Sequence, residues 1–448
     1  MKSALLASML WVLQCVAVAQ TSPSTAPAAP GSEMRVFVLT MGPGDEAYEK
    51  FGHNAIRVID DSETGDYHDV AYNWGTFDFD SGFIHFAVVF VQGKLLYSME
   101  PQKGAETIDY YTKELNRSVY QQELNLSPAQ KALLREELRW TNTKAHRYYR
   151  YDYYRDNCST RVRDVVNGLT GGRLRDMTEN APSNTSFRWH TRRLIAQAVW
   201  LYVALQGVLG EPVDQPISRW DEMFLPMALH DQLKYVMVPD PDGSGKLVPL
   251  VKEEQILYLS NRPASPTRPP TVVPWFGLAG IVYAAVLLAL GHFVRRKRWA
   301  RLSFVVVVMP WLLLIGLGSS VLVWAWCFTD HVVARHNENV LQVSPLMLPI
   351  IVLLPMVIFG SRRVLQATRW ITATIVGLAT IGILLKLTPL FYQMNWDIIA
   401  LTFPIDLAIA FIAWKLAELP PPAPDKRAAR RRGFETKGRA AKGKAGNS

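Results

Sequence analysis

Cysteine is scarce in this sequence, which has three cysteines among 448 residues. Cys15 lies in an apolar N-terminal stretch, Cys327 lies in a long hydrophobic run, and Cys158 alone lies in a polar region. The polar region therefore has no second cysteine for a disulfide, which excludes the disulfide-bonded scaffolds of small secreted proteins. No CxxC pair occurs and the nine histidines are scattered, so we expect no metal site and no cofactor.

Charged residues are nearly missing from five stretches in the C-terminal half, and these stretches are long enough to cross a bilayer. Basic residues gather in the loops RRKRWAR (295–301) and at Arg362, Arg363 and Arg369. Because cytoplasmic loops carry the excess of Lys and Arg, this pattern places the N-terminal region outside the cytoplasm. The five stretches are residues 275–293, 302–328, 346–360, 370–391 and 398–414.

The formal net charge is +9, and residues 425–443 hold most of the excess. Such a tail usually suggests nucleic acid as a partner. Here the neighbouring hydrophobic stretches favour a tail at the cytoplasmic membrane surface, so we expect a membrane and no nucleic acid.

The N-terminus has the pattern of a signal peptide, with Lys2, an apolar stretch and Ala17-Val18-Ala19 as the cleavage site. A Ser/Pro/Ala-rich linker follows it. The expected division is a signal peptide at 1–19, a linker at 20–33, an α+β periplasmic domain at 34–240, a second linker at 241–274, a five-span helical membrane domain at 275–415 and a basic cytoplasmic tail at 416–448.

Hydrophobic periodicity predicts a sheet with helices packed on it in the exported region. A hairpin begins at His53 and turns at 62–65, which puts His53 opposite a residue near Asn73 or Trp74, within about one residue of register. Ser127 and Gln130 form a capping box that starts a helix. Other expected elements are strands at 35–40, 95–99 and 119–126, helices at 45–51, 77–91 and 185–209, and a segment at 214–229 that either caps the core or forms a substrate lip.

The segment YYRYDYYRDNCSTRVRD (148–164) places Cys158 at or near the first turn of a helix. Unpaired backbone N–H groups there stabilise an anion, and Arg155, Arg161 and Arg163 add positive charge. We therefore expect the Cys158 thiol to ionise more easily than a free thiol. The alternative is a small buried apolar residue, which most free cysteines are. The polar and cationic neighbours favour a nucleophile.

A histidine in an equally polar setting, His53, supplies the base that a thiol nucleophile needs. Asn73 is the candidate that orients the imidazole, with Asp69 or Asp78 as alternatives. Backbone N–H groups at Cys158 and Ser159 are candidates for an oxyanion site. The candidate substrate or oxyanion residues are Asn157, Ser159 and Arg161. Because the histidine precedes the cysteine, the order fits a circularly permuted papain/NlpC-P60-like fold.

Polar residues also occur within the membrane region. The exported loop at 329–345 holds Asp330, His331, Asn337 and Asn339, which either cap helix ends or form a functional site at the membrane interface. Asp406 lies inside the fifth stretch, where a carboxylate is costly unless it is protonated or paired.

Five motifs together resemble the Lnb-type bacterial lipoprotein N-acyltransferases over about residues 35–414. The most specific are FGHNAIR and DNCSTRVRD, and the others are AYNWGTFDFD, WDEMFLP and TDHVVARHNENVLQVSPL. The resemblance implies that His53 and Cys158 are catalytic in a bacterial inner-membrane enzyme. It implies that an acyl chain passes from a phospholipid donor to Cys158, and then to the α-amino group of a lipidated lipoprotein acceptor.

Two other interpretations stay open on the residues alone. The first is a membrane-tethered cysteine hydrolase that acts on cell-wall peptide or lipid ester. The second is a membrane module without enzymatic activity, in which Cys158 is merely buried.

Overall fold

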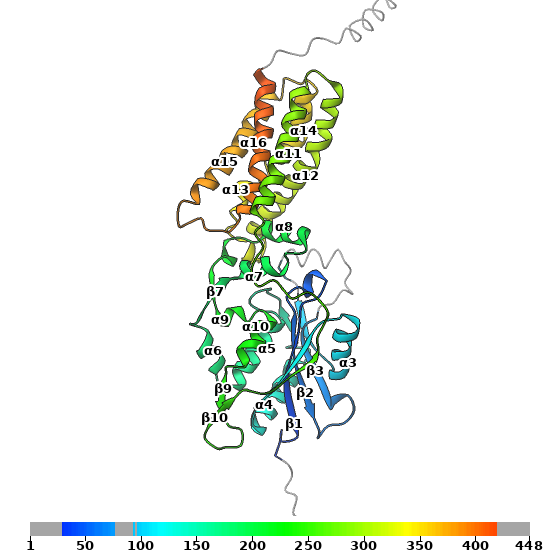
Figure 1. The fold of residues 1–448 in the computed structure, drawn as a ribbon, viewed down its shortest axis with the longest axis vertical. Coiled ribbons are helices and arrows are strands. Elements are labelled where there is room, and N and C mark those ends of the chain that lie inside the picture. The colour runs from blue at the N-terminus through cyan, green and yellow to red at the C-terminus, as the bar shows by residue number, and fades with distance from the viewer. Residues whose placement is uncertain (1–28, 77–92, 95, 419–448) are drawn as a thin grey trace, which may run out of the picture.

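The computed structural model describes residues 29–76, 93–94 and 96–418. These residues form an α+β domain and a bundle of long helices, stacked end to end (Figure 1). The mixed α+β domain and the five apolar helices confirm that much of the expected architecture, whereas the permuted papain-like arrangement stays a prediction. The expected signal peptide, most of the first linker, the helix expected at 77–91 and the tail beyond residue 418 lie outside the described residues.

One antiparallel sheet of seven strands is the centre of the α+β domain, with the strand order β11-β5-β1-β2-β3-β4-β6. Alternation along the central strands buries both faces: Val38 and Ile56 point to one face, and Leu39 and Ala55 point to the other. The strands are β1 (Met34–Met41), β2 (His53–Asp60), β3 (Asp69–Thr76), β4 (Leu96–Lys103), β5 (Val119–Leu124), β6 (Tyr148–Arg150) and β11 (Val251–Tyr258).

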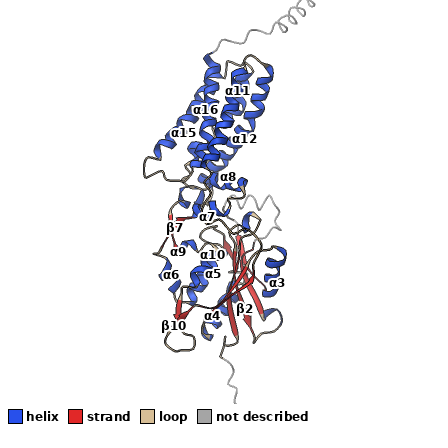
Figure 2. Ribbon diagram, in the orientation of Figure 1, coloured by secondary structure: helices blue, strands red, loops and turns tan. Residues whose placement is uncertain are grey.

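Helices cover both faces of this sheet (Figures 1 and 2). Helices α4, α5 and α10 pack on the face of Val38 and Ile56, whereas α3 and the π-helical turn η3 pack on the face of Leu39 and Ala55. These elements are α3 (Gly104–Asp109), η3 (Tyr110–Glu114), α4 (Pro128–Thr141), α5 (Cys158–Leu169) and α10 (Pro226–Leu233), and a short helix, α6 (Arg173–Thr178), follows α5 in the chain. The predicted capping box at the start of α4 is present, because Ser127 and Gln130 each accept a hydrogen bond from the other's backbone N–H.

The second linker was predicted to begin too early in the chain. Within 241–274, β10 (Leu247–Pro249) pairs with β9 (Met237–Pro239), and β11 pairs with β5 at the edge of the main sheet. Most of β11 is exposed and its centre is charged, as is common for edge strands. Hydrophobic patterning therefore did not reveal it.

Two predicted helices also differ from the structure. The helix expected at 185–209 is divided into β7 (Pro182–Ser186), α7 (Phe187–Leu194) and α8 (Val199–Val208), with a turn at 195–198. The short helix expected at 45–51 is the 3-10 turn η1 (Ala47–Glu49).

The segment at 214–229 packs over α5, as expected for a capping element. It follows the 3-10 turn η4 (Glu211–Val213) and contains β8 (Pro216–Ser218), which pairs with β7, and α9 (Arg219–Glu222). Three backbone carbonyls of this segment accept hydrogen bonds from side chains of or next to α5, namely those of Trp220, Met223 and Phe224.

Among the described residues, five candidate membrane spans follow, which agrees with the number expected from hydropathy. The third is assembled from a short helix and a longer one, α13 (Asn339–Gln342) and α14 (Met347–Ile358). The others are α11 (Val273–Phe293), α12 (Arg298–Phe328), α15 (Leu365–Leu385) and α16 (Trp396–Glu418).

A buried polar network joins the two parts. The loop between α12 and α13, which contains the 3-10 turn η5 (Val332–Ala334), contacts the end of α8. Asn337 and Asn339 donate from their side-chain amides to the last carbonyls of α8, at N···O distances of 2.9–3.0 Å. These carbonyls have no partner within their own helix, so the two asparagines satisfy them. This part of the loop therefore caps a helix end.

Asp406 lies on α16 within the bundle and is 2% exposed. Trp311 of α12 is the side chain that faces its carboxyl group, but among the described residues neither carboxyl oxygen has a partner within hydrogen-bond geometry. Of the two alternatives for this carboxyl group, protonated or paired, pairing is not found in the part of the chain that the structure describes.

Candidate functional site

The side chain of Asn157 fixes the start of α5, where Cys158 is the first helical residue. Its Oδ1 accepts from the Thr160 N–H at 2.9 Å, and its N–H donates to Thr160 Oγ1 at 2.8 Å. Its Nδ2 donates to the carbonyls of Tyr153 at 2.9 Å and Phe224 at 3.0 Å. The predicted position of Cys158 in the first turn is confirmed. Asn157 holds that turn against the capping element.

The Ser159 side chain also has a structural role. Its side chain is completely buried, and its Oγ donates to the Met223 carbonyl at 2.7 Å. The side chains of Asn157 and Ser159, both expected to contact substrate, are therefore used to attach α5 to the segment above it. The backbone N–H of Ser159 faces the sulfur at the helix start, whereas that of Asn157 is bonded to Thr160.

The Cys158 thiol is partly exposed, packs against the sheet core and has backbone N–H groups around it. The N–H groups of Asn54, Ser159 and Cys158 itself face the sulfur and favour the thiolate, as does the positive charge of Arg117. Burial opposes them and is the stronger effect, so the pKa of Cys158 lies above its usual value. The expectation of an easily ionised thiol is wrong, because it omitted this desolvation.

The three arginines expected to help the thiol ionise are engaged elsewhere or exposed. Arg161 forms a two-pronged ion pair with Asp156 and lies 4.3 Å above the Tyr149 ring, and Arg163 pairs with Asp164. Arg155 is exposed. Arg161 is thus held by Asp156 rather than standing open for a substrate.

His53 and Asn73 are joined by a hydrogen bond of 3.1 Å between Nε2 and Oδ1. Ala55 pairs with Asn73 across β2 and β3, and continuing that register puts His53 opposite Gly75, one residue past the predicted pair. The two side chains are diagonal neighbours on one face of the sheet, close enough to meet.

The orientation of the Asn73 amide assigns the tautomer of His53. Asn73 Nδ2 donates to the Ala71 carbonyl and to Gln102 Oε1, so Oδ1 is the atom that faces the imidazole. Nε2 of His53 must therefore carry the proton, and Nδ1 holds the lone pair. Of the alternative orienting groups, Asp69 is paired with Arg57, and Asp78 lies outside the described residues.

The pKa of His53 is lowered to about 4. Desolvation is the main cause, the charge of Arg117 adds to it, and the hydrogen bond to Asn73 opposes both. The imidazole is therefore neutral at pH 7 and able to accept a proton.

The backbone around His53 brings Cys158 close. The residue after His53 directs its N–H to the sulfur, and a Cβ placed on Gly75 would lie 4.0 Å from Cys158 Cβ. Gly75 has a φ of +105° at an irregularity in the pairing of β3 with β4, which glycine adopts without strain. Helix α5 therefore begins beside the strand ends that carry His53 and Asn73.

Arg117 is a residue of this site that sequence patterning missed. It is 3% exposed, its Nε donates to the Gly42 carbonyl at 2.7 Å, and its guanidinium lies 3.5 Å from Glu49 and 4.9 Å from the Tyr111 ring centre. Tyr111 in turn stacks on His53, with ring centres 5.8 Å apart. An arginine just before a strand carries no signal of burial, and only the fold brings it here.

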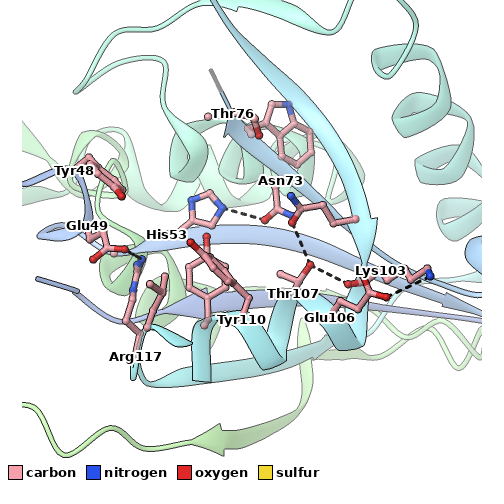
Figure 3. Close-up of a pocket in the computed structure, with 16 residues that line it drawn as sticks. Tyr48, Glu49, His53, Asn73, Thr76, Lys103, Glu106, Thr107, Tyr110 and Arg117 are labelled. Atoms are coloured by element: carbon pink, nitrogen blue, oxygen red, sulfur yellow. Dashed lines mark hydrogen bonds and ion pairs between the residues drawn. The ribbon is translucent and has the colours of Figure 1, made fainter. Parts of the chain in front are cut away.

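A cavity of about 590 Å³ is lined by His53, Asn73, Glu49, Tyr111 and Arg117 (Figure 3), and Cys158 is not among its described lining residues. In Figure 3 the Glu49–Arg117 pair lies on the other side of His53 from Asn73. Polar side chains of α3 and β4, including Thr107 and Gln102, complete the wall beyond Asn73. Within the described residues no three His, Cys, Asp or Glu side chains converge as metal ligands.

The polar loop residues lie apart from this cavity. Asn337 and Asn339 cap α8, and Asp330 lies 3.7 Å from Arg150 at the surface. The backbone at His331 passes close to Gly93, where an added Cβ would come within 3.3 Å of its nitrogen. The loop therefore connects the membrane bundle to the α+β domain.

The fold and this site define a class: an α+β domain in which Cys158 starts a helix beside the strand end that carries His53, anchored by apolar helices long enough to cross a membrane. The family model of the Lnb N-terminal periplasmic domain matches residues 26–198, which include His53, Asn73 and Cys158. This match confirms the resemblance to Lnb-type proteins and suggests a membrane enzyme that modifies lipoproteins. No curated protein and no solved structure matches the chain.

Replacing Asn157 tests the anchoring of α5. Asn157→Ala removes the helix cap and two buried donations, so the free energy of unfolding should fall by at least about 2 kcal/mol. Asn157→Ser keeps a cap acceptor and should lose less. Thermal unfolding of both variants in detergent measures the difference. An Asn157→Ala protein that unfolds with the wild type would show that this amide does not hold the helix.

Proposed function

We propose that the chain is a cysteine-dependent acyltransferase that moves an acyl chain from a phospholipid to the α-amino group of a lipidated lipoprotein. The observation that carries the proposal is the environment of the Cys158 sulfur. It lies at a capped helix start, faces three backbone N–H groups and is adjacent to the strand end that carries the His53–Asn73 pair. Thioester chemistry requires such a nucleophile and a nearby base.

In the first half-reaction, Nδ1 of His53 takes the thiol proton while the sulfur attacks the ester carbonyl of the donor. Because the raised thiol pKa and the lowered imidazole pKa both favour the uncharged forms, proton transfer accompanies the attack. The oxyanion accepts hydrogen bonds from the N–H groups of Asn54 and Ser159, which face the adjacent sulfur in the resting site. The C–O bond breaks, His53 returns the proton to the departing alkoxide, and an acyl thioester remains on Cys158.

The second half-reaction releases the acyl chain. The neutral α-amine of the acceptor attacks the thioester carbonyl, His53 takes a proton from the amine, and the C–S bond breaks. The sulfur leaves as a thiolate and recovers a proton from His53, so the site returns to its neutral state. The product is an amide. Throughout, Asn73 accepts from Nε2–H, which leaves Nδ1 as the nitrogen that takes and returns the proton.

The attached bundle supports a membrane-embedded substrate pair. Five apolar helices follow the domain, and the buried contacts of Asn337 and Asn339 join them to it. A site that acts on a diacyl phospholipid and a lipid-anchored acceptor gains from being held at the bilayer surface, since both reactants stay within reach. In this proposal the α+β domain is periplasmic and the basic tail is cytoplasmic.

Acyl capture tests the proposal. The full chain in detergent is incubated with a phospholipid that carries one defined acyl chain, and its peptides are analysed by mass spectrometry. The acyl mass should appear on the Cys158 peptide and be removed by hydroxylamine. Cys158→Ala should show none, and the peptide of Cys327, which is exposed on α12, is the internal control.

A lipidated peptide with a free α-amine should clear this adduct as an amide product, at least about tenfold faster than buffer alone. Equal clearance by water would identify a hydrolase instead. No adduct in the wild type, or an undiminished adduct in Cys158→Ala, would contradict the nucleophile assignment and leave the domain without the proposed chemistry.

The pH profile of Cys158 acylation tests the base. Because only neutral imidazole accepts the proton, the rate should hold down to about pH 5 and fall by half near pH 4, where His53 becomes charged. The Arg117 cation helps to keep His53 neutral, so Glu49→Gln/Arg117→Gln should move this acid limb to higher pH. Arg117→Lys keeps the charge and serves as the control. An acid limb of the wild type near pH 6.5, or one that does not move in the double variant, would reject these roles.

A further inference from the structure

Helix α8 has its polar side chains directed inward. Tyr202 and Gln206 are its only residues with polar side chains, and they are 2% and 0% exposed. The Tyr202 hydroxyl donates to Asp397 at 2.9 Å, and Gln206 Oε1 accepts from the buried Arg188 guanidinium at 3.0 Å. This is the reverse of a helix at a water-exposed surface, whose polar residues face outward.

The outward face of α8 is entirely apolar. Val199 and Trp200 are 66% and 70% exposed, and Val208 at the other end is 43% exposed. Residues spaced four apart share a helix face, so these three lie in line with Val203, Ala204 and Gly207. No polar side chain interrupts the face along the described helix. An apolar face of this kind indicates a contact with an apolar phase.

The position of α8 identifies that phase. Asn337 and Asn339, from the loop between α12 and α13, cap its last carbonyls, and Asp397 at the start of α16 binds Tyr202. Figure 1 places α8 at the end of the bundle nearest the α+β domain. It is therefore attached to the same ends of the spans that the charge pattern assigns to the exported side.

Exposed aromatic side chains mark the same level of the bundle. Trp275 in the first turn of α11 is 70% exposed, Phe328 at the end of α12 is 72% exposed, and Trp396 at the start of α16 is 50% exposed. Tryptophan gathers where a membrane protein crosses the interface between lipid and water. Trp200 of α8 is therefore a further exposed aromatic side chain at the end of the bundle where these three lie.

We propose that α8 is an interfacial helix whose face of Val199, Trp200, Val203, Ala204, Gly207 and Val208 is buried in the exported leaflet of the bilayer. Lipid is the occupant because α8 is bonded to the exported ends of the spans, where exposed aromatic side chains lie, and its face has no charged residue that would select a protein partner. The helix and the two asparagines that cap its end lie along the membrane surface. They hold the α+β domain at a fixed height above the membrane. This inference does not depend on the acyl-transfer proposal.

Site-directed spin labelling tests the proposal in the full chain. Cys15, Cys158 and Cys327 are replaced by serine, Ala204→Cys is labelled, and the protein is placed in phospholipid nanodiscs. Accessibility to oxygen, which partitions into lipid, is compared with accessibility to a polar nickel chelate. Leu278→Cys on the exposed face of α11 is the lipid control, and Leu133→Cys, 63% exposed on α4, is the water control.

The label on Ala204 should resemble the lipid control, with oxygen accessibility at least about threefold above that of Leu133→Cys. Val199→Cys repeats the measurement at the other end of the face. It serves as the test if the Ala204→Cys protein fails to fold. Labels that favour the nickel chelate, as in Leu133→Cys, would overturn the proposal. Strong dipolar broadening between copies, unchanged by dilution in lipid, would do so too, because it would assign the face to a second copy of the chain.

Discussion

The hydrogen bonds of Asn157 are the contacts on which the site depends. One amide caps α5 at Thr160, holds the preceding turn at Tyr153 and attaches both to the carbonyl of Phe224. This anchoring continues toward the membrane, because the Phe224 ring packs against Phe187 at the start of α7 with ring centres 5.1 Å apart. The next residue, Arg188, is fully buried and bonds to the turn after α8. The sulfur is thereby placed by a continuous set of buried contacts that reaches the bundle.

Burial decides the charge state of the site. Helix-start N–H groups and Arg117 favour the thiolate, but desolvation outweighs them and raises the pKa of Cys158. The same low polarity, together with Arg117, lowers the pKa of His53 to about 4. The resting pair is therefore uncharged, unlike the thiolate–imidazolium pair that a low thiol pKa would give. An uncharged pair would suit the acyl substrate proposed above, since no ion has to be desolvated when an apolar chain enters.

Local patterns predicted the parts of this structure that depend on nearby residues. The hairpin that joins His53 to Asn73, the capped start of α4 and the helix start at Cys158 all follow from turn chemistry and periodicity. Features that depend on distant packing were missed. Arg117 enters the site only through the neighbouring strands, and the edge strand β11 looks like a linker because its side chains face water. Arg161 and Arg163, which are beside Cys158 in sequence, pair with Asp156 and Asp164 instead.

We propose that Cys158 is a neutral thiol at rest and loses its proton to His53 only as it reacts. The pH dependence of its alkylation by iodoacetamide is the decisive measurement, with the Cys158 peptide of the full chain followed by mass spectrometry. We expect a rate that keeps rising with pH, with a midpoint above that of a free cysteine thiol. A rate that is already at its plateau between about pH 6 and pH 8 would reveal a preformed thiolate and rule out a neutral resting thiol.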